Sequence, residues 1–174
     1  MVKKLICIGV MLVMVFSFVG CGNGFREKKT KDMIELHTWY ITSGVPNNAI
    51  KLSYSDENAV FECIVDEGNF RTGFQYSKNK SAKHGDTIYW VPWETDLDGE
   101  PTSAITQAER TFVEIILKVD DNIIGYAVIK IERKGDSRSY NAKILKSALI
   151  PKVDGEYQNV TKEQIKNAIE KIKK

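Results

Sequence analysis

The chain has 174 residues, of which 43% are hydrophobic and 28% charged. This length is enough for one domain with a sizeable core. The 25 basic residues nearly balance the 23 acidic ones, and Lys3 and Lys4 belong to a terminal segment that is treated below. This balance argues against the strongly basic class of nucleic-acid-binding proteins, so no nucleic-acid partner is expected.

The first twenty residues have the pattern of an export signal. Lys3 and Lys4 precede an uncharged, mainly apolar run from 5 to 19, and Gly20 follows it. A membrane-spanning helix needs about 20 apolar residues, and this run is shorter. The sequence therefore predicts a signal peptide over residues 1–20 rather than a spanning helix.

The end of this segment, Phe18-Val19-Gly20-Cys21, resembles the lipobox of bacterial lipoproteins. Phe18 stands where that pattern usually has leucine. The resemblance implies cleavage before Cys21 and lipidation of the Cys21 thiol. It also implies a mature protein anchored by its lipid to the outer face of a bacterial membrane, in the cell envelope. An uncleaved anchor is the alternative, and it places the folded part outside the cytoplasm as well.

The stretch after Cys21 is charged and contains glycine, with few residues to bury. It predicts a flexible tether over residues 21–34, followed by a single β-rich domain over 35–174. Cys63 is the one cysteine of that domain, so no disulfide within the chain stabilises it. Period-two alternation places Cys63 on one face with Phe61 and Val65, where a free cysteine acts as a small hydrophobe.

Short β-rich runs separated by turn residues predict most of the domain to be strands. Two runs, 111–119 and 123–131, are dense in β-branched residues around an Asp-Asp-Asn turn, and they predict a hairpin in the middle of a sheet. Residues 78–83 and 94–108 are expected to be loops. The further predicted strands are Leu36–Ile41, Ala49–Tyr54, Ala59–Val65, Phe70–Tyr76, Asp86–Val91 and Tyr140–Ile150.

A helix is predicted over residues 161–173. Thr161 is a suitable N-cap and Gln164, three residues later, completes a capping box. An apolar stripe on this helix is expected to dock on a sheet edge or an open sheet face, and it consists of Ile165, Ala168, Ile169 and Ile172. Lysines cover the opposite face, as on a solvated helix or on one attracted to an anionic envelope surface.

Seven or so short strands with regular turns predict a mainly β fold, an antiparallel β-sandwich with one C-terminal amphipathic helix. The strand rhythm loosely resembles that of immunoglobulin-like modules on bacterial surfaces, although no Cys…Trp…Cys spacing is present. A half-open β-barrel is the alternative.

Four residues around the loop 94–108 are the candidate ligand-binding set: Trp90, Trp93, Asp96 and Asp98. A long loop carrying an aromatic residue at its entrance suits sugar stacking or a protein contact. The alternation of Glu94, Asp96 and Asp98 before a glycine begins like a calcium loop, but the twelfth position is Ile105 and not glutamate. A helix–loop–helix calcium site is therefore excluded, whereas a looser calcium site or an ordinary Asp-Gly turn stays open.

The chain has no motif of a known catalytic class, and no catalytic residue, metal site or cofactor is expected. His37 and His84 are the only histidines, too few for a convincing zinc site. We expect a non-enzymatic binding module for a protein or glycan partner at the cell envelope. The alternative is an accessory envelope hydrolase that uses carboxylates such as Asp96, Asp98 or Glu114.

Overall fold

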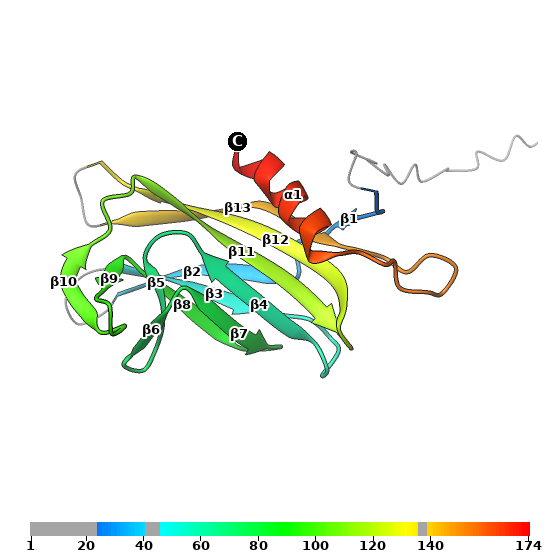
Figure 1. Cartoon of the computed structure of the whole chain (residues 1–174), viewed down its shortest axis with the longest axis horizontal. Coiled ribbons are helices and arrows are strands. Elements are labelled where there is room, and N and C mark those ends of the chain that lie inside the picture. Colours follow the sequence, from blue (N-terminus) through cyan, green and yellow to red (C-terminus); the bar gives the residue numbers. More distant parts are fainter. Residues whose placement is uncertain (1–23, 41–45, 136–138) are drawn as a thin grey trace, which may run out of the picture.

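The computed structural model describes residues 24–40, 46–135 and 139–174. Two open antiparallel sheets face each other, and one C-terminal helix covers the outer face of the larger sheet (Figure 1). This arrangement confirms the predicted mainly β sandwich, and the described strands do not close into a barrel. The finer likeness to immunoglobulin-like modules stays a prediction.

The larger sheet has six strands, and the predicted hairpin lies at its centre. Both residues of the two-residue turn have positive φ, 48° at Asp120 and 65° at Asp121, as in the tight turns that match strand twist. In spatial order the strands are β1 (Lys28–Lys29), β13 (Tyr140–Leu149), β12 (Asn122–Arg133), β11 (Arg110–Val119), β4 (Val60–Val65) and β7 (Asn79–Lys83).

The smaller sheet has five strands, and a separate two-stranded hairpin lies beside it. The order in the five-stranded sheet is β2 (Ile34–Tyr40), β3 (Pro46–Leu52), β8 (Thr87–Val91), β5 (Asn69–Thr72) and β6 (Gln75–Ser77). The separate hairpin consists of β9 (Trp93–Thr95) and β10 (Pro101–Ile105).

Three sequence-based expectations in this region were wrong. Residues 79–83, expected as a loop, form the edge strand β7, because β4 supplies hydrogen-bond partners that a polar sequence does not reveal. The expected single strand 70–76 is a hairpin that turns at Gly73, where φ is +59°. Most of the expected irregular segment 94–108 is the hairpin β9–β10.

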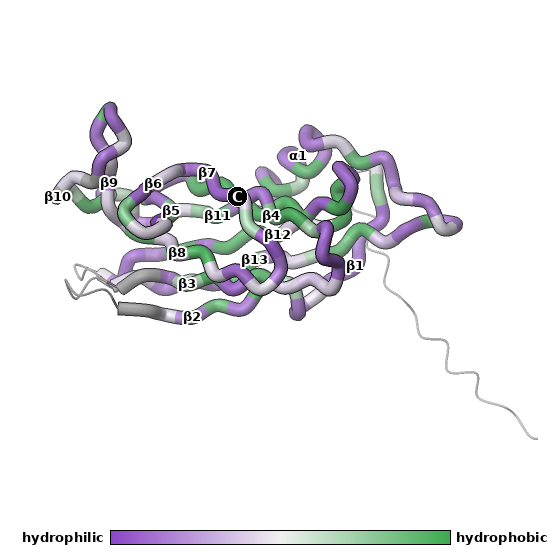
Figure 2. Tube along the Cα trace, turned by 90° about the horizontal axis from the view of Figure 1, so that it is seen from below, coloured by the Kyte–Doolittle hydropathy of each residue, from purple (hydrophilic) through white to green (hydrophobic). Residues whose placement is uncertain are grey.

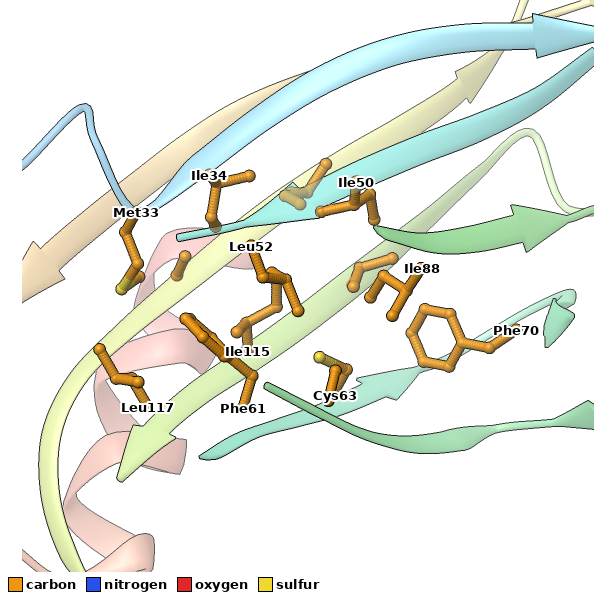
Figure 3. Packing of buried hydrophobic residues seen from close by; sticks show 14 of the residues in the cluster. Met33, Ile34, Ile50, Leu52, Phe61, Cys63, Phe70, Ile88, Ile115 and Leu117 are labelled. Atoms are coloured by element: carbon orange, nitrogen blue, oxygen red, sulfur yellow. The ribbon is translucent and has the colours of Figure 1, made fainter. Parts of the chain in front are cut away.

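The core between the sheets follows the period-two alternation of the strands. Phe61, Cys63 and Val65 are all buried, as predicted. Figure 3 shows the Cys63 sulfur among apolar side chains from both sheets. Burial raises the pKa of the Cys63 thiol to about 12. The thiol is therefore a packing group and not a nucleophile at neutral pH.

The helix α1 (Lys162–Lys173) has the predicted capping box. The Gln164 amide donates to the Thr161 hydroxyl at 3.2 Å, and the Thr161 amide donates to the Gln164 side chain at 2.9 Å. The stripe of Ile165, Ala168 and Ile169 is buried against the open outer face of the larger sheet, which resolves the two predicted docking modes. This cover explains why β12 is buried on both faces.

The described part of the N-terminal segment is packed against the domain. The prediction of a flexible tether over residues 21–34 was therefore wrong for the described residues. Its strand β1 pairs with strand β13, and Phe25 packs on the apolar cluster between α1 and the outer face of the larger sheet. Met33, counted in the tether, is buried. The sequence pattern missed this docking because the contact residues lie about a hundred positions further along the chain.

The long axis of the sandwich separates two ends of the molecule. The hairpin β9–β10 lies at one end, next to β5 and β6, in both Figure 1 and Figure 2. The described N-terminal segment and the loop after β13 lie at the other end (Figure 1). We call the first of these the hairpin end, defined by β5–β6 (69–77) and β9–β10 (93–105).

Candidate functional site

Trp90 does not take part in a surface site. It lies on β8 with its side chain in the core, and 0% of the residue is exposed. Its ring meets that of Tyr140 edge-on at 5.0 Å, and its indole nitrogen donates to the Glu67 carbonyl oxygen. The prediction that Trp90 binds a ligand is therefore corrected. Trp90 lies on the face of β8 that points into the sandwich, so its side chain is part of the core.

Trp93 occupies a different position at the start of β9. It is half-buried, and its ring lies 6.3 Å from that of Tyr76 on β6, with a tilt of 49°. The buried Asn69 side chain donates to the Trp93 carbonyl oxygen at 2.8 Å. These two contacts join the hairpins β5–β6 and β9–β10, so Trp93 holds the hairpin end together while the residue stays partly exposed.

Asp96 and Asp98 lie in the turn of β9–β10 and are exposed. One carboxylate oxygen of Asp96, Oδ1, accepts the backbone amides of Asp98 and Glu100 at 3.0 and 2.9 Å. Gly99 provides the positive φ of +83° that the turn needs. The motif is thus built as an Asp-Gly turn. Within the described residues no group of three or more His, Cys, Asp or Glu side chains is placed to hold a metal ion.

Two exposed apolar residues at the hairpin end were missed by the sequence analysis. Phe74, at the turn of β5–β6, is 92% exposed, and Leu97, at the turn of β9–β10, is 106% exposed. Turns seldom need a large apolar side chain, and each of these follows or precedes typical turn residues. An apolar residue inside a Gly or Asp turn is the signal that could have identified them.

The acids considered for hydrolysis do not converge. Glu114 lies on β11 and forms an ion pair with Lys173 of α1, and the same ammonium contacts Asp66 at 3.1 Å. Burial lowers the pKa of Lys173, but the hydrogen bonds from its ammonium to Glu114 and Asp66 outweigh this effect, and its pKa is raised overall. Glu114 therefore fixes the end of the helix to the sheet.

The two histidines are engaged in local contacts. The His37 imidazole lies 3.1 Å from the Glu35 carboxylate, and His84 Nδ1 accepts the Tyr54 amide at 3.0 Å. His37 lies on β2, whereas His84 lies in the turn between β7 and β8.

Two depressions on the surface are lined by charges of both signs. One of about 660 Å³ lies where β11 begins and β12 ends, and another of about 470 Å³ lies near the β11–β12 turn. In the second, Lys118 is paired with Glu62 at 2.6 Å. Neither depression presents charges of a single sign that would select an ion, whereas the hairpin end exposes large apolar side chains, so we take the hairpin end as the candidate site.

The chain was compared with protein-family models, with characterised proteins and with solved structures, and none of the three comparisons gives a match. Among the described residues, no helix has the length and apolar character needed to cross a membrane. Cys21 and the signal segment lie outside the described residues.

Proposed function

We propose that this protein is an exported lipoprotein, anchored through Cys21, that binds a partner protein at the cell envelope through its hairpin end. The observation that carries the binding surface is the exposure of Phe74 and Leu97 on two neighbouring hairpins. The anchor is inferred from the lipobox-like segment that ends at Cys21. The proposed role is binding, without enzymatic activity.

The shape of the hairpin end supports a protein partner. Large apolar side chains that protrude from turns lose solvent contact only when another surface covers them, and such residues serve as anchors in protein interfaces. The Tyr76–Trp93 contact and the Asn69 hydrogen bond restrain both hairpins before binding. Less entropy is then lost on association.

A glycan is the second candidate, and the half-buried ring of Trp93 is the observation that favours it. Sugar rings stack on exposed aromatic faces, while polar groups bond the hydroxyls. Phe74 and Leu97 offer no hydrogen bonds, so they add little to sugar binding. The two candidates therefore depend on different side chains.

Site-specific photo-crosslinking in the native envelope tests the proposal. A photoreactive residue at position 97 should give one defined protein adduct, and the same residue at position 64 is the control, because Ile64 is another exposed apolar residue (42%) but lies on β4. The variant Phe74→Ser should reduce the adduct at 97 without changing the melting temperature. Equal adducts from positions 97 and 64, or none at 97, would contradict the proposed surface.

The anchor is tested separately. Cys21→Ala should abolish acyl labelling and release the protein from the membrane fraction. Unchanged acyl labelling of this variant would refute lipidation at Cys21 and would leave the crosslinking result unaffected.

A further inference from the structure

The segment that follows the anchor is bound to the domain by its backbone. Lys28 and Lys29 form β1 and pair with Leu149 and Ala148 of β13. The Thr30 amide continues the ladder and donates to the Ser147 carbonyl oxygen at 3.0 Å. An extra edge strand of this kind has a fixed register, so residues 28–30 do not behave as a linker.

Side chains fix the same segment at a second place. The Glu27 carboxylate accepts the Tyr126 hydroxyl at 2.5 Å and pairs with the Lys146 ammonium, and only 11% of its side chain is exposed. Phe25 meets the Tyr126 ring edge-on at 6.4 Å. These charge-assisted contacts form only while the segment is docked, so they stabilise the docked state.

A third contact holds the backbone closest to the anchor. The Gln158 side chain accepts the Arg26 amide at 2.7 Å and donates to the Arg26 carbonyl oxygen at 3.0 Å. It also donates to the Pro151 carbonyl oxygen at 2.7 Å. One glutamine thus joins the N-terminal segment to the loop before α1. We call residues 25–30, with these contacts, the strap.

Docking of the strap shortens the reach of the anchor. A free chain from Cys21 to residue 34 could extend to about 45 Å, whereas the four peptide units from Cys21 to Phe25, where the strap begins, extend to at most about 14 Å. The strap emerges at the end of the sandwich opposite the hairpin end (Figure 1). Because the chain between Cys21 and the strap is short, the end of the sandwich that carries the strap stays near any membrane that holds the lipid.

The charge on the strap suits an anionic surface. Lys28 and Lys29 of the strap are exposed, as is Lys31 directly after it, whereas Glu27 is neutralised by Lys146. Asp32 is the exposed acid of this stretch. Basic residues directly beside a membrane anchor are attracted to anionic headgroups within a Debye length of the surface.

We propose that the strap orients the domain on the membrane: the end of the sandwich that carries the strap, with Lys28, Lys29 and the following Lys31, lies against anionic lipid headgroups, and the hairpin end points away from them. This inference rests on the proposed lipidation of Cys21. It deepens the proposed function, because it makes the protein a rigidly oriented binding module in place of a tethered one.

Energy transfer to labelled headgroups tests the orientation. The mature lipidated protein is reconstituted in vesicles of phosphatidylcholine and phosphatidylglycerol (7:3) with a headgroup acceptor dye. A donor dye is attached at Asn159→Cys, an exposed position next to Gln158, or at Leu97→Cys. Cys63 is buried, so it does not compete for the label. We expect at least threefold higher transfer from position 159 than from position 97.

The variant Phe25→Ser/Glu27→Ala, called the release variant, tests whether docking of the strap causes the orientation. It should bring the two transfer efficiencies within about 1.5-fold of each other, because the domain then samples many orientations, while circular dichroism confirms that the fold is kept. Equal transfer from both positions in the unaltered strap, or an unchanged ratio in the release variant, would overturn the orientation. An unchanged ratio in pure phosphatidylcholine vesicles would overturn the headgroup contact.

Two readouts on the same preparation separate this inference from the proposed function. Mass spectrometry of the mature protein reports acylation of Cys21, and its absence would refute the anchor. Hydrogen exchange of the Thr30 amide reports the strap alone and should be slowed at least tenfold relative to the release variant. Fast exchange at Thr30 in an acylated protein would overturn the strap and leave the anchor standing.

Discussion

The indole nitrogen of Trp90 donates a 2.9 Å hydrogen bond to the carbonyl oxygen of Glu67, which lies 23 positions earlier in the chain. This bond lets the largest core side chain keep its polar atom satisfied inside the sandwich. The turn after β4 passes directly over the ring, and only a residue without a side chain fits there. Gly68 occupies that place with φ of +72°.

Gly68→Ala should therefore be strongly destabilising. A Cβ at this position would lie 2.5 Å from the Val91 carbonyl oxygen and 2.8 Å from the Trp90 indole nitrogen. Strain at positive φ adds about 1–2 kcal/mol to this clash. Gly85→Ala is the control, since it has φ of +82° but open space around it. If thermal unfolding showed equal losses of stability for Gly68→Ala and Gly85→Ala, the close approach of Gly68 to Trp90 would not contribute to stability.

Trp90 and Trp93 should differ when each is replaced by alanine. Trp90→Ala removes a fully buried ring and should cost about 3–5 kcal/mol of unfolding free energy. Trp93→Ala removes a half-buried ring and its contact with Tyr76, so a loss of about 1–2 kcal/mol is expected, together with a weaker crosslink at position 97. Chemical denaturation measures both values. A larger stability loss for Trp93→Ala would show that it is the core residue of the pair.

Cys63 should make the free energy of unfolding decrease as the pH becomes alkaline. Burial holds the pKa of its thiol at about 12 in the folded protein, above the value of about 8.5 expected in the unfolded chain. The unfolded state therefore loses this proton first, and stability is fully present below about pH 8.5 and declines as pH rises toward 12. Cys63→Ala should show a shallower decline between pH 9 and 11. Identical slopes, or fast reaction of native Cys63 with a thiol reagent at pH 8, would contradict this.

The helix α1 should contribute to global stability through its buried stripe. Ile169→Ala opens a cavity beneath the helix and should cost about 2–5 kcal/mol. Thr161→Ala removes the N-cap and should cost about 0.5–2 kcal/mol. Lys166→Ala, on the exposed face, is the control and should stay within about 0.5 kcal/mol. A melting temperature unchanged by Ile169→Ala would mean that α1 does not dock in solution.

Local patterns were sufficient for the central hairpin and the helix. The hairpin is specified by β-branched residues around the Asp120–Asp121 turn, and the cap of α1 by Thr161 and Gln164. The two turn residues of the hairpin are adjacent and the two capping residues of the helix are three positions apart, so both signals are visible before folding. Period-two alternation likewise identified Phe61, Cys63 and Val65 as core residues.

Edge pairing was beyond the reach of local patterns. Residues 79–83 form a strand only because β4 offers a free edge, and residues 28–29 only because β13 does. Their own polar side chains favour no structure. Backbone hydrogen bonds to a distant strand decide such segments, and the sequence of the segment itself does not encode the partner.

The candidate site divides in the same way. The sequence by itself determined that aromatic and acidic residues gather around residues 89–98, and that one cysteine is left for the core. Only the tertiary structure decided that Trp90 packs inward while Trp93 leans on Tyr76. It also decided that Glu27 meets Tyr126, 99 positions away. Burial and contacts between distant segments depend on how the two sheets and the helix close over each other, and that closure is a property of the whole chain.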